Sequence, residues 1–304
     1  MPEAAEAAPA RPALRPARRL RMPRLGGRRL GLAEVLSVAF LVVLTLCAIF
    51  APAIAPFGPT EPDILSNLMP PSTTGEFGMP PHYLGTDVLG RDVFSGVIYG
   101  TRVSLIVALS AVLGAGVVGT LIGLVAGYSR GWIDEVIMRL VDVQLAFPFI
   151  LLAIMIMYII GPGLMNVIIV LVVAKWPIYA RVARAEAMRH AASDFVLAAH
   201  SMGAGHLRIM LRHILPNAMT PLIVVAAFAV PQMIIYEAAL SFLGLGLPPD
   251  EVSWGSMLSA GRSVLEQAWW VATFPGLAIM CTVLSINILG ETLRKWVGPG
   301  FGTD

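Results

Sequence analysis

Six runs of mostly apolar residues follow one another along the 304-residue chain, and polar stretches separate them. A helix that spans a membrane needs about 20 predominantly apolar residues, and the runs are of that order. Because a segment surrounded by lipid must satisfy its backbone hydrogen bonds internally, each run is predicted to be a helix. The predicted fold class is therefore all-α, a polytopic membrane protein with spans at residues 32–54, 103–128, 141–160, 167–183, 221–246 and 270–289.

The polar stretches give the domain layout around these spans. Residues 1–30 are rich in Ala, Pro and Arg and have no apolar periodicity, which is typical of a disordered basic tail. We expect a first membrane helix at 31–55, a loop at 56–101, a five-helix domain at 102–290 and a tail at 291–304. The first apolar run is longer than the ~7–15 residues of a signal-peptide core, so an uncleaved span is favoured over a signal peptide.

Composition points to the same class of protein. Charged residues make up 13% and hydrophobic residues 57% of the chain, and the mean hydropathy is +0.78. Average soluble domains carry about 25% charged residues, so the composition argues against a soluble globular enzyme. Cys47 and Cys281 both lie within apolar runs and therefore predict no disulfide framework.

Lysines and arginines are distributed unevenly between alternate polar segments. Of the 21 residues, 18 lie in the two tails and around the segments 129–140 and 184–217, and three lie in the loops 56–101 and 247–269 or at their edges. Cytoplasmic segments of membrane proteins are enriched in these two residue types. Both termini are therefore predicted to be cytoplasmic, and those two loops are predicted to be extracytoplasmic.

The basic segment 193–216, with the sequence SDFVLAAHSMGAGHLRIMLRHILP, predicts two helices in the cytoplasm. The first begins at Asp194 and is ended by Gly203, where a sharp reversal of the chain requires a positive φ angle. A second helix is expected from about His206 until Pro216 ends it.

The first of these helices carries an apolar face whose members recur at i, i+3, i+4 and i+7. They are Phe195, Ala198, Ala199 and Met202. One interpretation is that this face packs against the protein's own loops. We favour docking into a partner's groove, because a helix of two turns is not stable alone in water.

The same segment resembles the cytoplasmic EAA loop of ABC importer permeases, which has the pattern Glu-Ala-Ala, three residues, Gly, nine residues and Ile-x-Leu-Pro. The positions that match at this spacing are Ala198, Ala199, Gly203, Leu215 and Pro216. Leu197 and His213 replace the family's Glu and Ile, so no salt bridge from that Glu is expected. The helix–Gly–helix arrangement is kept.

Two further segments, Leu84–Leu105 and Glu237–Gly255, resemble the peptide/nickel-type permeases. The resemblance is to the C-type membrane subunit of dipeptide and oligopeptide importers, and the three matching segments occur in order over most of residues 80–290.

The resemblance implies a multi-pass permease in the bacterial inner membrane that forms half of a translocation pathway for peptides or related solutes. It also implies the partners: a second permease in a heterodimer, two cytoplasmic ATPase subunits and an extracytoplasmic solute-binding protein, with no nucleic acid. ATP and Mg²⁺ would be held by the ATPases and no cofactor by this chain. Consistently, neither Lys175 nor Lys295 follows a Gly, so the Gly-Lys-Ser/Thr of a phosphate-binding loop does not occur in the sequence.

Glu237 stands out because it is a carboxylate in an apolar run. At the centre of a bilayer such a group costs roughly 2.5–3.5 kcal/mol, so it normally faces a bundle interior or an aqueous cavity. We predict that position, as a gate candidate in the pathway, over a simple interfacial one. Lys175 and Trp176 near a predicted span end are expected to be interfacial anchors.

The remaining signals are structural. Gly119, Gly123 and Gly127 form a small-xxx-small ladder that predicts close helix packing. Asp87 and Asp92, beside glycines, predict turn and cap roles. No catalytic or metal-binding residues are predicted.

Two other classes of function compete with the importer subunit. A self-sufficient secondary transporter or channel would need its own ion-coupling groups within the spans, and Glu237 is one candidate. An intramembrane enzyme would need a Ser–His or metal constellation within the spans, and all five histidines lie outside them. The sequence does not identify the cargo, and a dipeptide, an oligopeptide, a nickel chelate and glutathione are all candidates.

Overall fold

The computed structural model describes residues 31–72, 80–248 and 251–297. The predicted tail at 1–30 lies outside these ranges. The described residues form helices joined by turns, with an isolated bridge between Thr86 and Asp92. The helices are α1 (Leu32–Ile49), α2 (Ala51–Ile54), a 3-10 turn (Ile64–Ser66), α3 (Val93–Ser129), α4 (Gly131–Ala146), α5 (Phe149–Ile160), α6 (Leu164–Ala191), α7 (Asp194–Ser201), α8 (His206–Ile209), a π-helical turn (Met210–Ile214), α9 (Leu215–Phe242), α10 (Trp254–Arg262) and α11 (Trp270–Val297).

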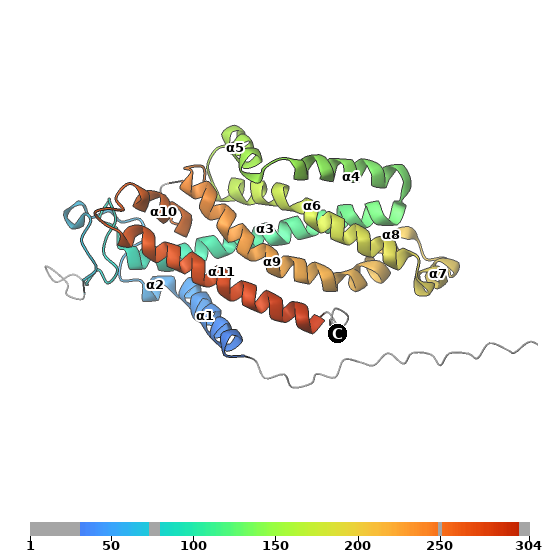
Figure 1. Ribbon diagram of the computed structural model, residues 1–304, viewed down its shortest axis with the longest axis horizontal. Coiled ribbons are helices and arrows are strands. Elements are labelled where there is room, and N and C mark those ends of the chain that lie inside the picture. The colour runs from blue at the N-terminus through green and yellow to red at the C-terminus, as the bar shows by residue number, and fades with distance from the viewer. Residues whose placement is uncertain (1–30, 73–79, 249–250, 298–304) are drawn as a thin grey trace, which may run out of the picture.

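The long helices α3, α4, α6, α9 and α11 run along the long axis of the molecule, and the connections gather at its two ends (Figure 1). One end holds α10, α5 and the chain between α2 and α3; we call it the α10 end. The opposite end holds α7, α8 and the short α3–α4 connection; we call it the α7 end. This arrangement agrees with the alternation of sides predicted from the charges.

Five helical stretches are long and apolar enough to cross a membrane, and α4 with α5 makes a sixth if that pair is taken as one span. The two helices meet at 95°, so the third span predicted at 141–160 is divided between two helices. The break falls at Phe147 and Pro148, which both have extended backbone conformations. A proline cannot donate a backbone hydrogen bond and disfavours a helical residue before it, which explains the break at this point.

Most helices extend beyond the predicted spans. α3 begins at Val93 rather than near residue 103, α4 already begins at Gly131, α6 continues to Ala191, and α11 reaches Val297. The predicted loop at 247–269 contains α10. Sequence hydropathy marks only the apolar part of a helix, whereas the hydrogen-bonded helix continues through polar turns at each end.

The centre of the bundle is the pair α3 and α6, and the predicted glycine ladder lies between them. A Cβ atom at Gly119, Gly123 or Gly127 would lie only 2.3, 2.2 and 2.4 Å, respectively, from a carbonyl oxygen of α6. The two backbones are therefore in direct contact at three successive turns, which confirms the predicted close packing.

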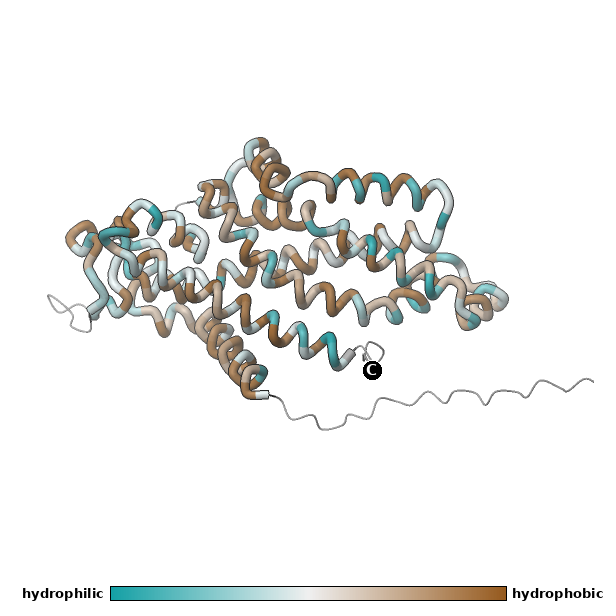
Figure 2. Tube along the Cα trace, in the orientation of Figure 1, coloured by the Kyte–Doolittle hydropathy of each residue, from teal (hydrophilic) through white to brown (hydrophobic). Residues whose placement is uncertain are grey.

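The periphery of the bundle is apolar. α1 packs on α11 and α3 but buries only Ser37, Leu44 and Ala48 of its own residues. Figure 2 shows hydrophobic residues along most of the length of this helix. An apolar surface of this extent is stable in lipid and would be unfavourable in water.

Candidate functional site

The helix α7 lies at one tip of the molecule, and its geometry follows from the residues that end it (Figure 1). Gly203 has a φ of 82°, which confirms the predicted positive angle. Its N–H donates to the carbonyl of His200 at 2.9 Å, and the N–H of Ala204 donates to that of Ala199 at 3.1 Å. These two bonds form a Schellman motif, which turns the chain back toward the bundle.

The predicted apolar face of α7 divides between two sides of the helix. Ala199 is buried together with Val196, one turn apart, so the expectation that Ala199 shares the exposed face is wrong. These two positions form the side of α7 that packs on the rest of the chain. The exposed apolar side chains, which we call the α7 patch, are Phe195, Leu197, Ala198 and Met202.

The helix that follows Gly203 does not end at Pro216. α8, the π-helical turn and α9 form one continuous helix from His206 to Phe242, with Pro216 in the first turn of α9. The wider π turn includes the carbonyl four residues before the proline, where the ring would otherwise clash. The side chain of Asn217 also donates to the carbonyl of His213 at 2.6 Å. Leu215, half-buried, and Pro216, exposed, therefore lie on the same helix as Glu237.

Glu237 is fully buried, as predicted for a group that faces the bundle interior. Its Oε1 accepts hydrogen bonds from Ser241 Oγ at 2.8 Å and Ser253 Oγ at 2.7 Å. Its Oε2 accepts from Ser104 Oγ at 3.3 Å. The carboxyl group thus joins α3, α9 and the start of α10, and it does not lie on an open surface of the chain.

A tryptophan reinforces this junction. Trp254, the first residue of α10, is fully buried and donates from Nε1 to the carbonyl of Val97 on α3 at 3.0 Å. Ser253 caps the helix by accepting from the N–H of Ser256. The two segments that resemble peptide permeases, 84–105 and 237–255, therefore meet in space.

The two aspartates of the first of these segments have the expected turn and cap roles. Asp92 caps α3 by accepting from the N–H of Ser95 at 2.8 Å. Asp87 accepts from the N–H groups of Leu89 at 2.8 Å and Arg91 at 2.9 Å, and it also pairs with the Arg91 side chain at 2.7 Å.

Lys175 and Trp176 do not anchor the chain at a membrane interface, so this prediction is wrong. Both are 8% exposed and lie near the middle of α6, because that helix continues well past them. Trp176 Nε1 donates to Gln144 Oε1 on α4 at 2.8 Å. Lys175 Nζ donates to Gln232 Oε1 on α9 at 2.7 Å.

The cluster around Lys175 is the site that reasoning from the sequence missed. Tyr236, one turn after Gln232, accepts from Lys175 Nζ at 3.4 Å and places its ring 4.6 Å from the ammonium. Phe149 of α5 stacks on Tyr236 with ring centroids 3.9 Å apart. A lysine in one apolar run, with glutamine and tyrosine four residues apart in another, is the sequence signal that could have indicated the cluster.

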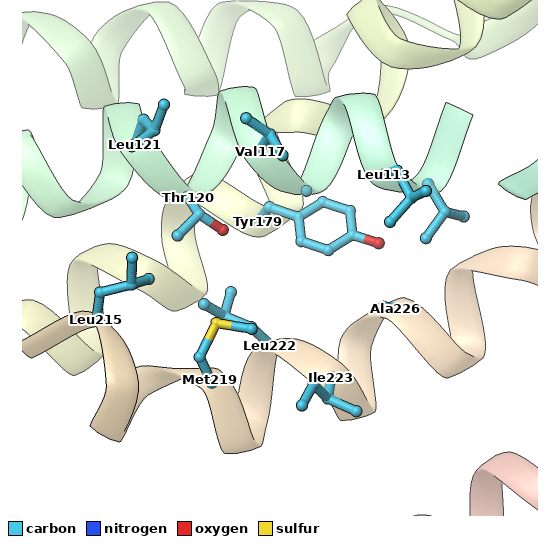
Figure 3. A pocket seen from close by; sticks show the side chains of 12 residues that line it. Leu113, Val117, Thr120, Leu121, Tyr179, Leu215, Met219, Leu222, Ile223 and Ala226 are labelled. Atoms are coloured by element: carbon cyan, nitrogen blue, oxygen red, sulfur yellow. The ribbon is translucent and has the colours of Figure 1, made fainter. Parts of the chain in front are cut away.

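A separate apolar cavity of about 340 Å³ lies between α3, α6 and α9 (Figure 3). The hydroxyl of Tyr179 points into it and has no hydrogen-bond partner among the described residues. Its other lining residues are almost entirely aliphatic, including Leu113, Leu222 and Ile223. The cavity is thus suited to apolar groups.

The fold is similar to that of chains from a solved ABC transporter. The structures describe inward facing conformations of the methionine transporter MetNI. One has a TM-score of 0.55 and 19% identity over 67% of this chain and 96% of that chain. A second crystal form gives 0.55 and 18% over 66% and 96%. At this identity the similarity concerns the fold.

Sequence comparison gives the class and then the family. Residues 33–71 match the N-terminal TM domain of oligopeptide transport permease C. This match, the similarity of the fold and the loop described above together define the class of protein, which is the permease subunit of an ABC importer. The chain belongs to the family of binding-protein-dependent transport system inner membrane components, which matches residues 119–303.

Individual relatives are similar over most of their length. The chain is 44% identical to the Di/tripeptide transport system permease protein DppC of Pseudomonas aeruginosa, over 86% of each chain. It is 40% identical to the Dipeptide transport system permease protein DppC of Haemophilus influenzae, over 87% of this chain and 90% of the relative. It is also 44% identical to the Glutathione transport system permease protein GsiD of Pectobacterium atrosepticum, over 72% of each.

Proposed function

We propose that this permease subunit forms half of the pathway through which an ATP-driven importer moves short peptides across the inner membrane. The assignment of short peptides as the cargo rests on the 44% identity to a di/tripeptide permease over 86% of both chains. The other half is a second, different permease, an external binding protein delivers the peptide, and two cytoplasmic ATPase subunits hold ATP and Mg²⁺. This chain supplies no cofactor site of its own.

Coupling to the ATPases is assigned to the α7 patch. Phe195 is 42%, Leu197 56% and Met202 82% exposed, on a helix of only eight residues. Leaving apolar surface in water is unfavourable by about 25 cal/mol per Å². Burial of the patch in a groove on an ATPase subunit therefore contributes that free energy to association. Asp194 and Gly203 set the start and the end of the helix, and Ala199 holds it to the bundle.

Movement of α7 would reach the membrane by two routes. α6 leads into α7 through a short connection, and Ala204 leads out of it toward the continuous helix that contains Leu215 and Pro216. At the far end of that helix, Glu237 joins α3 and α10. We assign Glu237 to the gate through this junction, as a group that holds helices together at the α10 end.

The orientation of the subunit follows from the same assignment: the α7 end and both termini face the cytoplasm. Single cysteines test it in a chain whose Cys47 and Cys281 are replaced by alanine. Ser263→Cys, exposed after α10, should react with a membrane-impermeant thiol reagent in intact cells. Ser201→Cys, exposed on α7, should react only in inverted vesicles, and labelling of Ser201→Cys from outside would contradict the orientation.

Reconstitution tests the function itself. The complete complex in proteoliposomes should import radiolabelled dialanine when the loaded binding protein is outside and ATP inside. Import by this chain alone, without ATP, would instead support a secondary transporter or channel.

A further inference from the structure

The ammonium group of Lys175 lies in the middle of the bundle, and none of the residues that the structure describes is an acidic partner to it. The residue is 8% exposed, and its two hydrogen-bond acceptors, Gln232 Oε1 at 2.7 Å and the Tyr236 hydroxyl at 3.4 Å, are both neutral. Within the described part of the chain no aspartate or glutamate forms a salt bridge with it. Buried charges are normally paired, so this one points to an anion from outside the chain.

Glu237 does not neutralise this charge although it follows Tyr236 directly. Its two carboxyl oxygens are occupied by three serine hydroxyls, on α3, on α9 itself and at the start of α10. Consecutive residues of a helix point about 100° apart, so Tyr236 can face Lys175 while Glu237 faces the junction with α3 and α10.

Two glutamines lie on the helices that neighbour this part of α6. Gln232 is exposed on the surface of this isolated chain, and Gln144 of α4 lies half-buried beside Trp176 on the same helix as Lys175. Polar side chains within membrane spans face other protein or a water-filled cavity rather than lipid. The surface of α6 and α9 around Lys175 and Gln232 therefore faces the partner permease or the pathway between the two subunits.

On the basis of the proposed function, we propose that Lys175 is the contact for the carboxylate of the cargo, the C-terminal carboxylate of a short peptide in transit. An ammonium has three N–H donors, and two are used by neutral acceptors that a passing carboxylate can replace. A carboxylate adds the attraction of an opposite charge, which is strong where water is largely excluded and which neither the glutamine nor the tyrosine supplies, so the exchange favours the carboxylate. Gln232 and Tyr236 would reoccupy the ammonium when the peptide leaves, as transport requires.

The test compares three variants within the complete reconstituted importer, with radiolabelled dialanine as the probe. Lys175→Met removes the charge and keeps the length of the side chain, and Lys175→Arg keeps the charge. Lys295→Met makes the same change at the chain's other lysine, on the exposed end of α11. For each we measure dialanine uptake, ATP hydrolysis stimulated by the loaded binding protein, and recovery of the partner permease.

We expect Lys175→Met to lower the kcat of uptake about tenfold, with KM unchanged because the binding protein sets capture. Stimulated hydrolysis should stay within twofold of the unmodified complex, so the ATP used per dialanine rises about as much as uptake falls. Lys175→Arg should recover at least about a third of the uptake, and Lys295→Met should behave as the unmodified complex.

Other outcomes overturn the inference in distinguishable ways. Full uptake by Lys175→Met, while the unmodified complex imports dialanine, would show that no carboxylate contact is needed. An equal fall in uptake and hydrolysis would assign Lys175 a structural role. Loss of the partner permease from the purified complex would identify its anion as an acidic residue of that subunit. If the unmodified complex does not import dialanine at all, the proposed peptide function itself fails.

Discussion

The two ends of this bundle are built on different principles. At the α10 end, side chains far apart in the sequence are hydrogen-bonded to one another: Glu237 to Ser104 and Ser253, and Trp254 to the backbone of α3. At the α7 end the helix is fixed mainly by its own backbone turn at Gly203, and most of its apolar side chains are exposed.

The side-chain contacts of the α10 end are formed within this chain, whereas the apolar surface of the α7 end requires a partner to cover it. The buried side chains of Glu237, Ser253 and Trp254 at the α10 end have partners within the chain, so this junction is formed before assembly. The α7 patch leaves apolar surface in water, which association would cover. Substitutions at the α10 end should therefore act first on the stability of the subunit, and substitutions at the α7 end on assembly and coupling.

The largest expected effect is at the α7 patch. Phe195→Asp places a charge in the surface assigned to the ATPase groove and should abolish co-purification of the ATPase subunits, with at least about a hundredfold loss of affinity. Leu65→Asp is the matched control, because Leu65 is an exposed apolar residue near the α10 end. Retention of the ATPases by Phe195→Asp in a pull-down would remove α7 from the interface.

At the α10 end the strongest change should be Glu237→Leu. It leaves three buried serine hydroxyls without their acceptor, at about 1–3 kcal/mol each, so a loss of at least about 3 kcal/mol is expected. Glu237→Gln keeps Oε1 and should preserve assembly while lowering transport. Thermal unfolding in detergent and uptake in vesicles measure the two effects; equal Tm values for Leu and Gln variants would contradict the junction.

A smaller effect is expected at the turn that aims α7. Gly203→Val must adopt a positive φ angle, which costs a branched residue about 1–2 kcal/mol. Part of the ATPase should remain bound, but hydrolysis should be uncoupled from uptake. Gly205→Val is the control, since Gly205 has a φ of −69° and equally open surroundings. The prediction fails if the two variants show the same ATP used per imported dialanine.

The smallest effect should come from Tyr128→Phe. This substitution removes only the hydrogen bond of 2.8 Å between the Tyr128 hydroxyl and His206 Nδ1, which links α3 to α8 on the surface. A single exposed bond contributes at most about 0.5–1.5 kcal/mol, so Tm and coupling should change little. A large loss of coupling would show that α8, rather than α7, transmits the movement.

Features determined by local chemistry could be predicted from the sequence. Gly203 needs a positive φ because the chain reverses there, and three glycines spaced by four form one stripe on any helix. The interior position of Glu237 follows from the cost of placing a carboxylate in lipid. None of these depends on knowing which helices are neighbours.

The errors arise where a distant contact decides. Lys175 and Trp176 resemble interfacial anchors until α9 and α4 supply the acceptors that bury them. Ala199 belongs to the apolar face of α7, but only the packing of that helix shows that it turns inward. Pro216 signals a helix end, yet a π-helical turn lets the helix continue. The serine donors to Glu237 and the acceptors around Lys175 both come in part from helices that are remote in the sequence.

The glycine ladder between α3 and α6 restricts how the bundle can rearrange. Gly119, Gly123 and Gly127 recur every four residues, which is about 6 Å along a helix axis at 1.5 Å per residue. A slide of one or two residues would place side chains against the carbonyl oxygens of α6, where even a Cβ does not fit. The two helices therefore cannot slide past each other along their axes. We expect α3 and α6 to move as one rigid body while the remaining helices change position around them.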